Sequence, residues 1–227
     1  MNTVFRKEIK YVIPVEQYQK LVPQLDACMK RDPNGKNGTY TVRSQYFDSL
    51  SDQDLQDNLS GLEEKRKIRI RIYSPEADWA KLEYKCKSGS DGVKYSMKLT
   101  REEAELMERH RYGFLLTREE PLAKQLYSKM LHGAYRPKAI VEYQRTAFFY
   151  PVSDVRITFD HQIKTGVTPY GLFKKDGATV SLMNEDVGVL EVKYNDFLPA
   201  HIKAIVQQID HLAEASSKYS KSRLFYL

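Results

Sequence analysis

Apolar and polar residues alternate strictly along several short stretches of the chain. In residues 67–72 isoleucine fills every second position, and Lys or Arg fills the positions between. Successive side chains of a strand point to opposite faces, so this pattern predicts a strand with one apolar and one cationic face. Similar alternation, or enrichment in β-branched and aromatic residues, predicts the other strands. The expected strands cover residues 4–13, 39–49, 63–73, 78–87, 93–99, 138–150, 154–163 and 188–195.

Helical spacing of apolar residues appears between and after these strands. Thr100 and Glu103 form a capping-box pattern, which predicts that a helix begins there and runs to about His110. Gly133 suits the C′ position that ends a preceding helix. The expected helices cover residues 15–29, 100–110, 118–132 and 198–214, with a short helix or loop over 50–61 and loops over 32–38 and 164–177.

Eight to ten short strands joined by tight turns favour a largely antiparallel sheet that is closed or nearly closed. The fold class expected is α+β, with helices covering the apolar face of the sheet from outside. The cationic faces would then line the inside, as in a tunnel. No linker forces a second domain, so a single domain over residues 1–227 is expected.

Composition narrows the class of protein further. An apolar fraction of 41% argues against a disordered chain. No apolar run is long enough to cross a bilayer, and the N-terminal residues lack the apolar core of a secretory signal. The two cysteines suggest neither a disulfide framework nor a metal site. The expected location is therefore the cytoplasm.

The net charge of +6 gains meaning when the cations are sorted by face. Arg69 and Arg71 share one face of their strand, about 7 Å apart. Lys81 and Lys85 likewise share a face of the next strand. For any one strand, a solvated outer face explains such a pattern, but its repetition over neighbouring strands favours a bound anion. Guanidinium groups bind phosphate oxygens in pairs, and lysine adds a movable charge.

Carboxylates interspersed among these cations suggest a metal ion. Glu8, Glu83, Glu142 and Glu191 are unfavourable neighbours for phosphate, but a divalent cation can bridge carboxylate and phosphate. The sequence contains no P-loop, zinc-protease, EF-hand or nucleophile-elbow motif. Trp79 and the tyrosines are interpreted as core and strand packing.

Residues Arg6, Glu8 and Lys10 form an RxExK pattern on the first strand. It resembles the ExExK signature of the triphosphate tunnel metalloenzymes, or CYTH superfamily, with Arg6 in place of the first Glu. Taken with the later segments, the chain is similar to the VTC branch of that superfamily, the polyphosphate polymerase domain. The supporting segments are FRKEIKY (5–11), SQYFDS (44–49), KIRIRIY (67–73), KLEYKCK (81–87), EYQRTAF (142–148), RITFD (156–160), LEVKYN (190–195) and SKYSKSRLFY (217–226).

The resemblance implies an eight-stranded antiparallel β-tunnel with a C-terminal helix. It implies transfer of the terminal phosphate of ATP to a growing polyphosphate chain, assisted by Mn²⁺ or Mg²⁺. The implied catalytic phosphate binders are Lys10, Arg69, Arg71, Lys85 and Arg145. Further substrate-binding residues would be Arg6, Lys98, Arg156, Lys193, Lys218 and Lys221. Glu191 matches the metal-binding carboxylate of the LEVK segment, and Glu8 is either a second metal ligand or an ion-pair partner.

Two other functions remain open from the sequence. The same cations could serve a metal-dependent tripolyphosphatase or nucleoside triphosphatase, in which water replaces the phosphate chain as acceptor. A non-catalytic polyphosphate-binding module is the other alternative. The expected ligands are ATP and polyphosphate or triphosphate. Nucleic acid is disfavoured because the aromatic residues alternate onto the apolar faces. Any link to a membrane would run through a membrane-protein partner.

Overall fold

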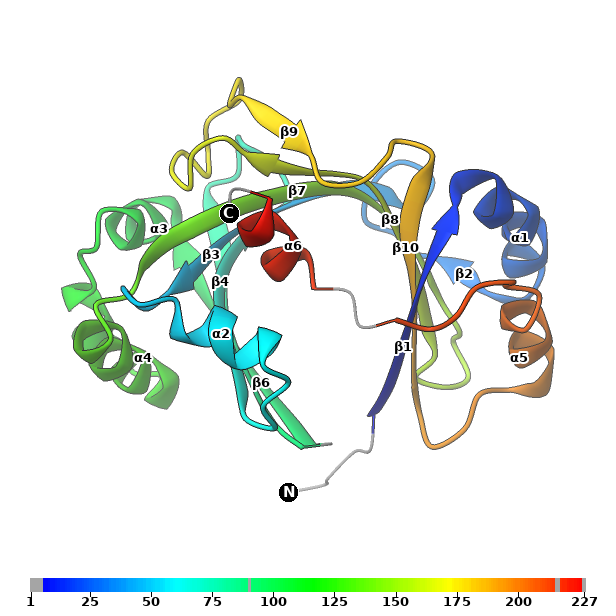
Figure 1. The fold of residues 1–227 in the computed structure, drawn as a ribbon, viewed down its shortest axis with the longest axis horizontal. Coiled ribbons are helices and arrows are strands. Elements are labelled where there is room, and N and C mark those ends of the chain that lie inside the picture. Colours follow the sequence, from blue (N-terminus) through cyan, green and yellow to red (C-terminus); the bar gives the residue numbers. More distant parts are fainter. Residues whose placement is uncertain (1–5, 90, 215–216, 226–227) are drawn as a thin grey trace. The chain divides into compact units, whose positions relative to one another are not determined.

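The computed structural model describes residues 6–89, 91–214 and 217–225 (Figure 1). Its strands are β1 (Arg6–Pro14), β2 (Lys30–Arg31), β3 (Thr39–Asp48), β4 (Lys65–Ile72), β5 (Trp79–Ser88), β6 (Asp91–Thr100), β7 (Arg136–Phe149), β8 (Arg156–Gly166), β9 (Thr179–Ser181) and β10 (Val187–Asn195). Its helices are α1 (Val15–Cys28), α2 (Gln53–Leu59), α3 (Arg101–Glu108), α4 (Pro121–His132), α5 (Ala200–Val206) and α6 (Lys218–Leu224), with a short 3-10 helix η1 (Gly113–Thr117). The predicted α+β class and C-terminal helix are confirmed.

Eight strands follow one another in a single hydrogen-bonded path, in the order β1-β10-β8-β7-β3-β4-β5-β6. The short strands β2 and β9 pair with β7 and β8 beside this path. The registers of β1 with β10, β10 with β8, and β3 through β6 are antiparallel. The eight-stranded antiparallel arrangement is therefore confirmed. Within the described residues the path has two ends, β1 and β6, and so is not hydrogen-bonded into a closed barrel.

The chain divides into two compact units. The first comprises Met1–Thr41, Tyr143–Lys164 and Ser181–Ser217, and the second comprises Val42–Glu142, Thr165–Val180 and Lys218–Leu227. Strands β3, β7, β8 and β9 contribute residues to both units. That the whole chain forms a single domain stays a prediction.

In the first unit, helices α1 and α5 pack on the apolar face of the strands. Apolar side chains of α1 at helical spacing join the odd-numbered residues of β8 and the even-numbered residues of β10 in one buried core. The ring of Tyr18 stacks on Phe159 at 3.9 Å between centroids. Gly188 makes room for that phenylalanine, because a Cβ there would lie 2.4 Å from Phe159 Cζ. The polar side chains of these strands consequently lie on the opposite face.

In the second unit, helices α3 and α4 cover the apolar face of β4 and β5. Ile68, Ile70 and Ile72 are at most 1% exposed and share a core with apolar residues of both helices. The predicted capping box is confirmed: Thr100 Oγ1 accepts from the Glu103 backbone, and Glu103 Oε2 accepts from the Thr100 backbone. The cationic residues between the isoleucines are therefore directed away from the helices.

Two details differ from the sequence-based expectation. The helix expected over 198–214 spans only α5, because the chain beyond it pairs with the edge of β1: Ala213 bridges Tyr11, and Glu214 donates to the Lys10 carbonyl. This tertiary pairing replaces the helical hydrogen bonds. Gly133 is the C-cap of α4, and the left-handed conformation falls on the next residue, at φ 45°. Glycine is needed at 133 because a Cβ would lie 2.6 Å from the Tyr135 ring.

Among the described helices, none has the length and hydropathy required to cross a bilayer.

Candidate functional site

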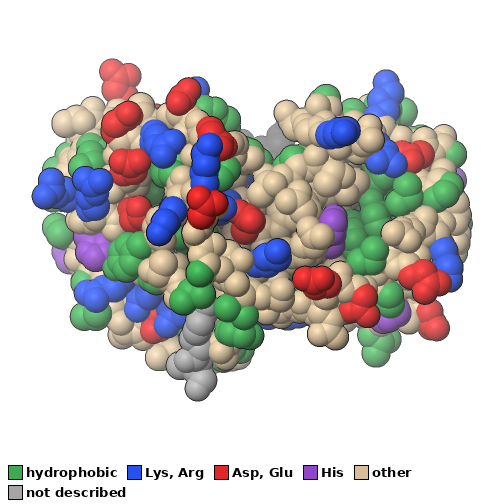
Figure 2. Space-filling view, turned by 90° about the horizontal axis from the view of Figure 1, so that it is seen from above, with side chains coloured by type: hydrophobic (Ala, Val, Ile, Leu, Met, Phe, Trp, Pro, Cys, Tyr) green, Lys and Arg blue, Asp and Glu red, His purple; other side chains and the backbone are tan. Residues whose placement is uncertain are grey.

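Three strands of the second unit place their polar side chains on one surface, called here the β4–β6 face. The register aligns these side chains in cross-strand rows. The rows are Lys67–Lys85–Lys94, Arg69–Glu83–Ser96 and Arg71–Lys81–Lys98. Only one of the nine residues is acidic, so the face carries a local excess of positive charge. Figure 2 shows one face of the molecule, on which cations and carboxylates are interspersed.

Glu83 is the buried centre of the β4–β6 face, with a side chain 2% exposed. Its Oε2 accepts from Arg69 Nε at 2.7 Å and lies 3.6 Å from Arg71 Nη1, while its Oε1 pairs with Lys94 Nζ. Burial by itself would raise the pKa of Glu83, but the two guanidiniums and the lysine outweigh it and hold the pKa well below its usual range. One ionised carboxylate thus holds three cations, which retain a net positive charge for an anion.

Tyr46 of β3 belongs to the same surface, although sequence reasoning gave it no role in the site. It lies opposite Arg69 in the register, and Arg69 Nη1 donates to its hydroxyl at 3.3 Å. Burial would raise the pKa of Tyr46, but the positive charges of Arg69, Lys67 and Arg71 outweigh burial and lower the pKa to about 8. The signal was available in the strand alternation, because Tyr46 shares the parity of Ser44 and Asp48 rather than that of Phe47.

The C-terminal helix α6 is anchored in this unit near Tyr46. Tyr219 stacks on Tyr46 at 5.2 Å and donates to Asp48 Oδ2 at 2.6 Å, while Arg223 makes two hydrogen bonds to Asp52. The predicted binders Lys218 and Lys221 both lie in α6 and are partly exposed. The helix that carries them is therefore fixed in the same unit as the β4–β6 face.

The remaining predicted residues of this unit lie at the margins of the face. Lys85 is exposed, in the row that contains Lys67 and Lys94. Lys98 is also exposed and places its ammonium 5.3 Å from the centre of the Trp79 ring. Both are accessible to solvent, unlike Arg71, which is only 8% exposed.

The first unit contains a second group of predicted residues, called here the β10 cluster. Lys10 faces Glu191 across the β1–β10 ladder, and Glu8 faces Lys193. Lys10 Nζ lies 2.8 Å from Glu8 and 3.5 Å from Glu191, and Lys193 Nζ lies 2.8 Å from Glu191 and 3.9 Å from Glu8. Two carboxylates and two ammonium groups therefore alternate at the corners of one square, and their charges cancel.

The pKa values of the two lysines of the β10 cluster are shifted in opposite directions. Burial would lower the pKa of Lys10, but Glu191 and Glu8 outweigh burial and raise it above its ordinary value. For Lys193 burial is the stronger effect, and the pKa lies below its ordinary value. The nearby positive charge of Arg145 contributes to that lowering.

Arg145 of β7 lies beside the β10 cluster. Its Nε and Nη2 donate to the two carboxylate oxygens of Asp160 at 2.7 and 2.8 Å, and its guanidinium lies 5.3 Å from the Tyr143 ring centre. Tyr143 lies two positions before Arg145 on β7 and shares its face of the strand. Asp160 is the missed partner of this arginine.

Two other predicted residues contribute less to the β10 cluster. Arg156 is adjacent to Lys193 in the register, but its guanidinium donates to Asp32 at 2.8 Å and to the Tyr40 hydroxyl at 3.1 Å. That contact holds the loop after β2. Arg6 lies in β1 opposite Asn195. The structure brings Glu8, Lys10, Glu191 and Lys193 into one group, with Arg145 next to it.

The donors available for a divalent metal are the carboxylates of Glu8 and Glu191. No group of three or more His, Cys, Asp or Glu side chains suited to a metal is found in the described residues. Mg²⁺ commonly binds one or two carboxylates and takes its other ligands from water and substrate phosphates. The residues present fit that pattern, in which phosphate oxygens complete the coordination.

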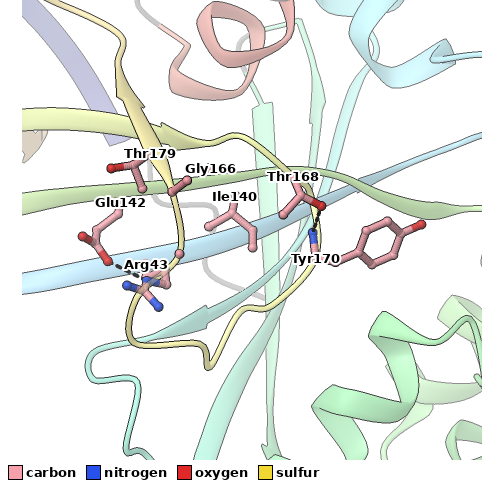
Figure 3. Close-up of a pocket in the computed structure, with 9 residues that line it drawn as sticks. Arg43, Ile140, Glu142, Gly166, Thr168, Tyr170 and Thr179 are labelled. Atoms are coloured by element: carbon pink, nitrogen blue, oxygen red, sulfur yellow. Dashed lines mark hydrogen bonds and ion pairs between the residues drawn. The ribbon is translucent and has the colours of Figure 1, made fainter.

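A small hollow lies in the second unit (Figure 3). It is lined by Arg43 of β3, on the face opposite to Tyr46, and by Ile140 and Glu142 of β7. Its charged lining is the ion pair of Arg43 with Glu142, at 2.5 Å. The Arg43 guanidinium also donates to the carbonyls of Leu172 and Lys174, which holds the loop that follows β8. Because these contacts join Arg43 to Glu142 and to that loop, we interpret the charged lining of the hollow as structural.

Comparison with solved structures supports the architecture. The fold resembles a candidate adenylate cyclase from Bacillus halodurans, with a TM-score of 0.54, 12% identity and 95% of each chain covered. It also resembles a candidate adenylate cyclase from Vibrio parahaemolyticus, with a TM-score of 0.51, 12% identity, and 97% of this chain and 98% of that chain covered. At such identity the likeness concerns the fold alone.

No protein of curated function matches the chain in sequence. The VTC domain family, in contrast, matches residues 5–225. This match covers the segments from which the resemblance was drawn, except for the last residue of the final one. It confirms the resemblance: the chain belongs to the VTC domain family.

Proposed function

We propose that this chain transfers the terminal phosphate of ATP to a growing polyphosphate chain, with the assistance of a divalent metal ion. Membership of the VTC domain family supports the proposal. The observation that carries it is the β4–β6 face, where Arg69, Arg71 and Lys94 surround a single buried carboxylate. Such an excess of held cations suits a compact polyanion.

The proposed reaction is an exchange of phosphoanhydride bonds. A terminal oxygen of the polyphosphate attacks the γ-phosphorus of ATP, the bond from that phosphorus to the β–γ bridging oxygen breaks, and ADP leaves with the bonding electrons. Negative charge spreads over the peripheral oxygens in the transition state, so positioning and charge neutralisation supply most of the catalysis. Arg69 and Arg71 are suited to this, because guanidinium groups bind phosphate oxygens in pairs and both residues are already held in place by Glu83.

The β10 cluster would have a different role. Its cations are balanced by carboxylates, so it offers little net attraction for an anion alone. Glu191, with Glu8 as a second donor, would hold a divalent metal. Such a metal, when bound, neutralises developing charge on phosphate oxygens. Lys10 would then be released from its carboxylate partners to contact phosphate.

The test is the identity of the product. Purified chain incubated with ATP and Mn²⁺ should form acid-stable, long-chain polyphosphate and release ADP in step. Arg69→Ala should slow chain growth about 10²-fold, whereas Arg109→Ala, which changes a 68% exposed arginine directly after α3, should leave it unchanged. Release of ADP with orthophosphate as the sole phosphate product would contradict the polymerase.

A triphosphate hydrolase is the second candidate, and the retained Glu8 beside Lys10 favours it. A carboxylate in that place can orient water as easily as it can hold a metal. Inorganic tripolyphosphate distinguishes the two activities: a hydrolase converts it to pyrophosphate and orthophosphate without ATP, while the proposed polymerase needs ATP for growth. Binding of polyphosphate without any turnover would identify the chain as a binding module.

The predicted cytoplasmic location and membrane-protein partner stay predictions.

A further inference from the structure

The β4–β6 face ends in a pair of exposed aromatic rings. Tyr73 follows Arg71 at the same strand parity, and Trp79 precedes Lys81 in the same way. Their exposed fractions are 39% and 40%, and their ring centroids lie 6.3 Å apart. The ammonium of Lys98 lies 5.3 Å from the Trp79 ring centre. Trp79 therefore lies on the cationic face of the sheet.

This placement differs from the sequence-based interpretation, which assigned Trp79 to core packing and all strand aromatics to the apolar faces. The interpretation holds for Phe47 and Tyr84, which are 1% and 4% exposed. It is wrong for Trp79, which does not belong to the buried core of its unit. A large aromatic residue exposed beside a second one, next to rows of cations, is the kind of surface on which planar ligands stack.

We propose that Trp79 and Tyr73 form a base-stacking subsite for the nucleoside triphosphate whose phosphates bind at Arg69 and Arg71. The inference rests on the proposed function, in which ATP is the phosphate donor. Successive rows on one face of a strand lie about 7 Å apart. The aromatic pair is thus one row beyond Arg71 and two rows beyond Arg69, which leaves space for a ribose between base and phosphates.

The chemistry of the pair defines what it selects. An aromatic face stacks on any nucleobase, and a purine covers more of the indole than a pyrimidine does. Lys98 lies over the Trp79 ring and so supplies a cation beside the proposed base-stacking subsite. Inorganic polyphosphate has no base, so the subsite distinguishes the donor from the growing chain.

Trp79 is the single tryptophan of the chain, so intrinsic tryptophan fluorescence reports on this position alone. Titration with ATP should quench that fluorescence, and titration with inorganic tripolyphosphate should leave it nearly unchanged. In calorimetry, Trp79→Ala should weaken ATP binding about tenfold and leave tripolyphosphate binding unchanged. Trp79→Phe should restore part of the loss, and Tyr73→Ala should give a smaller one.

Tyr95→Ala is the matched control. Tyr95 is similarly exposed, at 42%, and lies on β6, but its ring packs with Tyr84 on the opposite face of the sheet. Its removal should not change binding of either ligand. Because Trp79 is partly exposed, its truncation should leave the thermal unfolding of the chain close to that of the wild type.

The outcomes separate this inference from the proposed function. If tripolyphosphate binds but Trp79→Ala binds ATP as tightly as the wild type does, the subsite is overturned while the phosphate site stands. If the wild type binds neither ligand, the proposed function is overturned and the subsite with it. If the wild type binds a purine-rich RNA oligonucleotide more tightly than ATP, and Trp79→Ala loses that binding, the aromatic pair belongs to a nucleic-acid surface instead.

Discussion

The β4–β6 face and the β10 cluster are built from the same kind of strand, yet they differ in charge balance. On the β4–β6 face one buried carboxylate holds three cations. In the β10 cluster two carboxylates alternate with two lysines. Alternation along one strand places charges on one face in both cases. The cross-strand neighbours decide whether those charges accumulate or cancel.

This difference suggests that the two regions have different roles in binding a polyanion. A surface with excess positive charge attracts a polyanion directly, whereas a balanced one requires a further cation before an anion gains by binding there. The comparison is strengthened if variants on the β4–β6 face affect anion binding most, and variants in the β10 cluster affect stability and metal dependence. It fails if the two sets behave alike.

The largest effect is expected from Arg71→Ala. Arg71 lies 3.6 Å from the buried Glu83 carboxylate and donates to Ser44 Oγ at 3.3 Å, so its guanidinium is held before substrate arrives. Loss of one such preorganised donor should lower kcat/KM for chain growth about 10²- to 10³-fold. Arg71→Lys should restore only part of the lost kcat/KM, because lysine keeps the positive charge but lacks the paired N–H donors of the guanidinium. Steady-state kinetics on both variants, with Arg109→Ala as control, measure this; wild-type kinetics in Arg71→Ala would contradict the assignment.

The next largest effect, on tripolyphosphate affinity, is expected from Glu83→Gln. Whether the affinity rises or falls distinguishes two roles of Glu83. If only net charge matters, removing a negative charge from the β4–β6 face should tighten tripolyphosphate binding. If Glu83 instead positions the guanidiniums, tripolyphosphate affinity and kcat/KM should both fall about tenfold. Losses of this size are typical when a residue that orients a ligand-binding side chain is changed. We expect the fall, because Arg69 Nε loses a 2.7 Å charged hydrogen bond. Calorimetry with tripolyphosphate decides between them.

A matched pair of lysine variants compares the two regions in stability. Lys193→Met removes one corner of the β10 cluster and leaves Glu191, whose side chain is 8% exposed, with one partner fewer. The free energy of unfolding should fall by about 1–3 kcal/mol. Lys94→Met on the β4–β6 face should cost about 1 kcal/mol or less, because Lys94 is 47% exposed and Glu83 keeps both arginines. Urea unfolding measures both values, and equal losses would count against the comparison.

Strand alternation predicted much of this arrangement, because backbone geometry forces Ile68, Ile70 and Ile72 to one face whatever the rest of the chain does. The sequence could not predict which residues face each other across neighbouring strands. Arg69 lies opposite Glu83 only because of the register between β4 and β5. The same limit explains Asp160, which lies 15 positions from its partner Arg145.

Trp79 illustrates a different kind of error. Its parity with Lys81 and Glu83 placed it on the cationic face, but the general tendency of aromatic residues to be buried was given more weight. Tyr46 is buried, as aromatic residues usually are, but its parity matches that of Asp48 and so places it on the polar side of β3. For strands with one charged face, position is a better guide to function than residue type.

The smallest expected effect concerns the titration of Tyr46. The pKa of this phenol is lowered to about 8 because Arg69, Lys67 and Arg71 outweigh the effect of burial. Between pH 8 and 10 the folded chain releases the proton and the unfolded chain retains it, so this group's contribution to stability rises with pH in that window. The ionised phenol also adds a negative charge to the β4–β6 face, and tripolyphosphate affinity should decline by a few-fold as the pH rises through 8.

Absorbance at 295 nm detects tyrosinate directly, and the difference between the wild type and Tyr46→Phe isolates this residue. That difference should titrate near pH 8 in the chain alone. It should move toward the ordinary tyrosine pKa of about 10 when tripolyphosphate occupies the face, because the bound anion neutralises the cations that stabilise the phenolate. Tyr46→Phe should also remove the decline in affinity above pH 8. A titration unmoved by tripolyphosphate would mean that the anion binds away from Tyr46, and the charge excess of the β4–β6 face would then not be the site of phosphate binding.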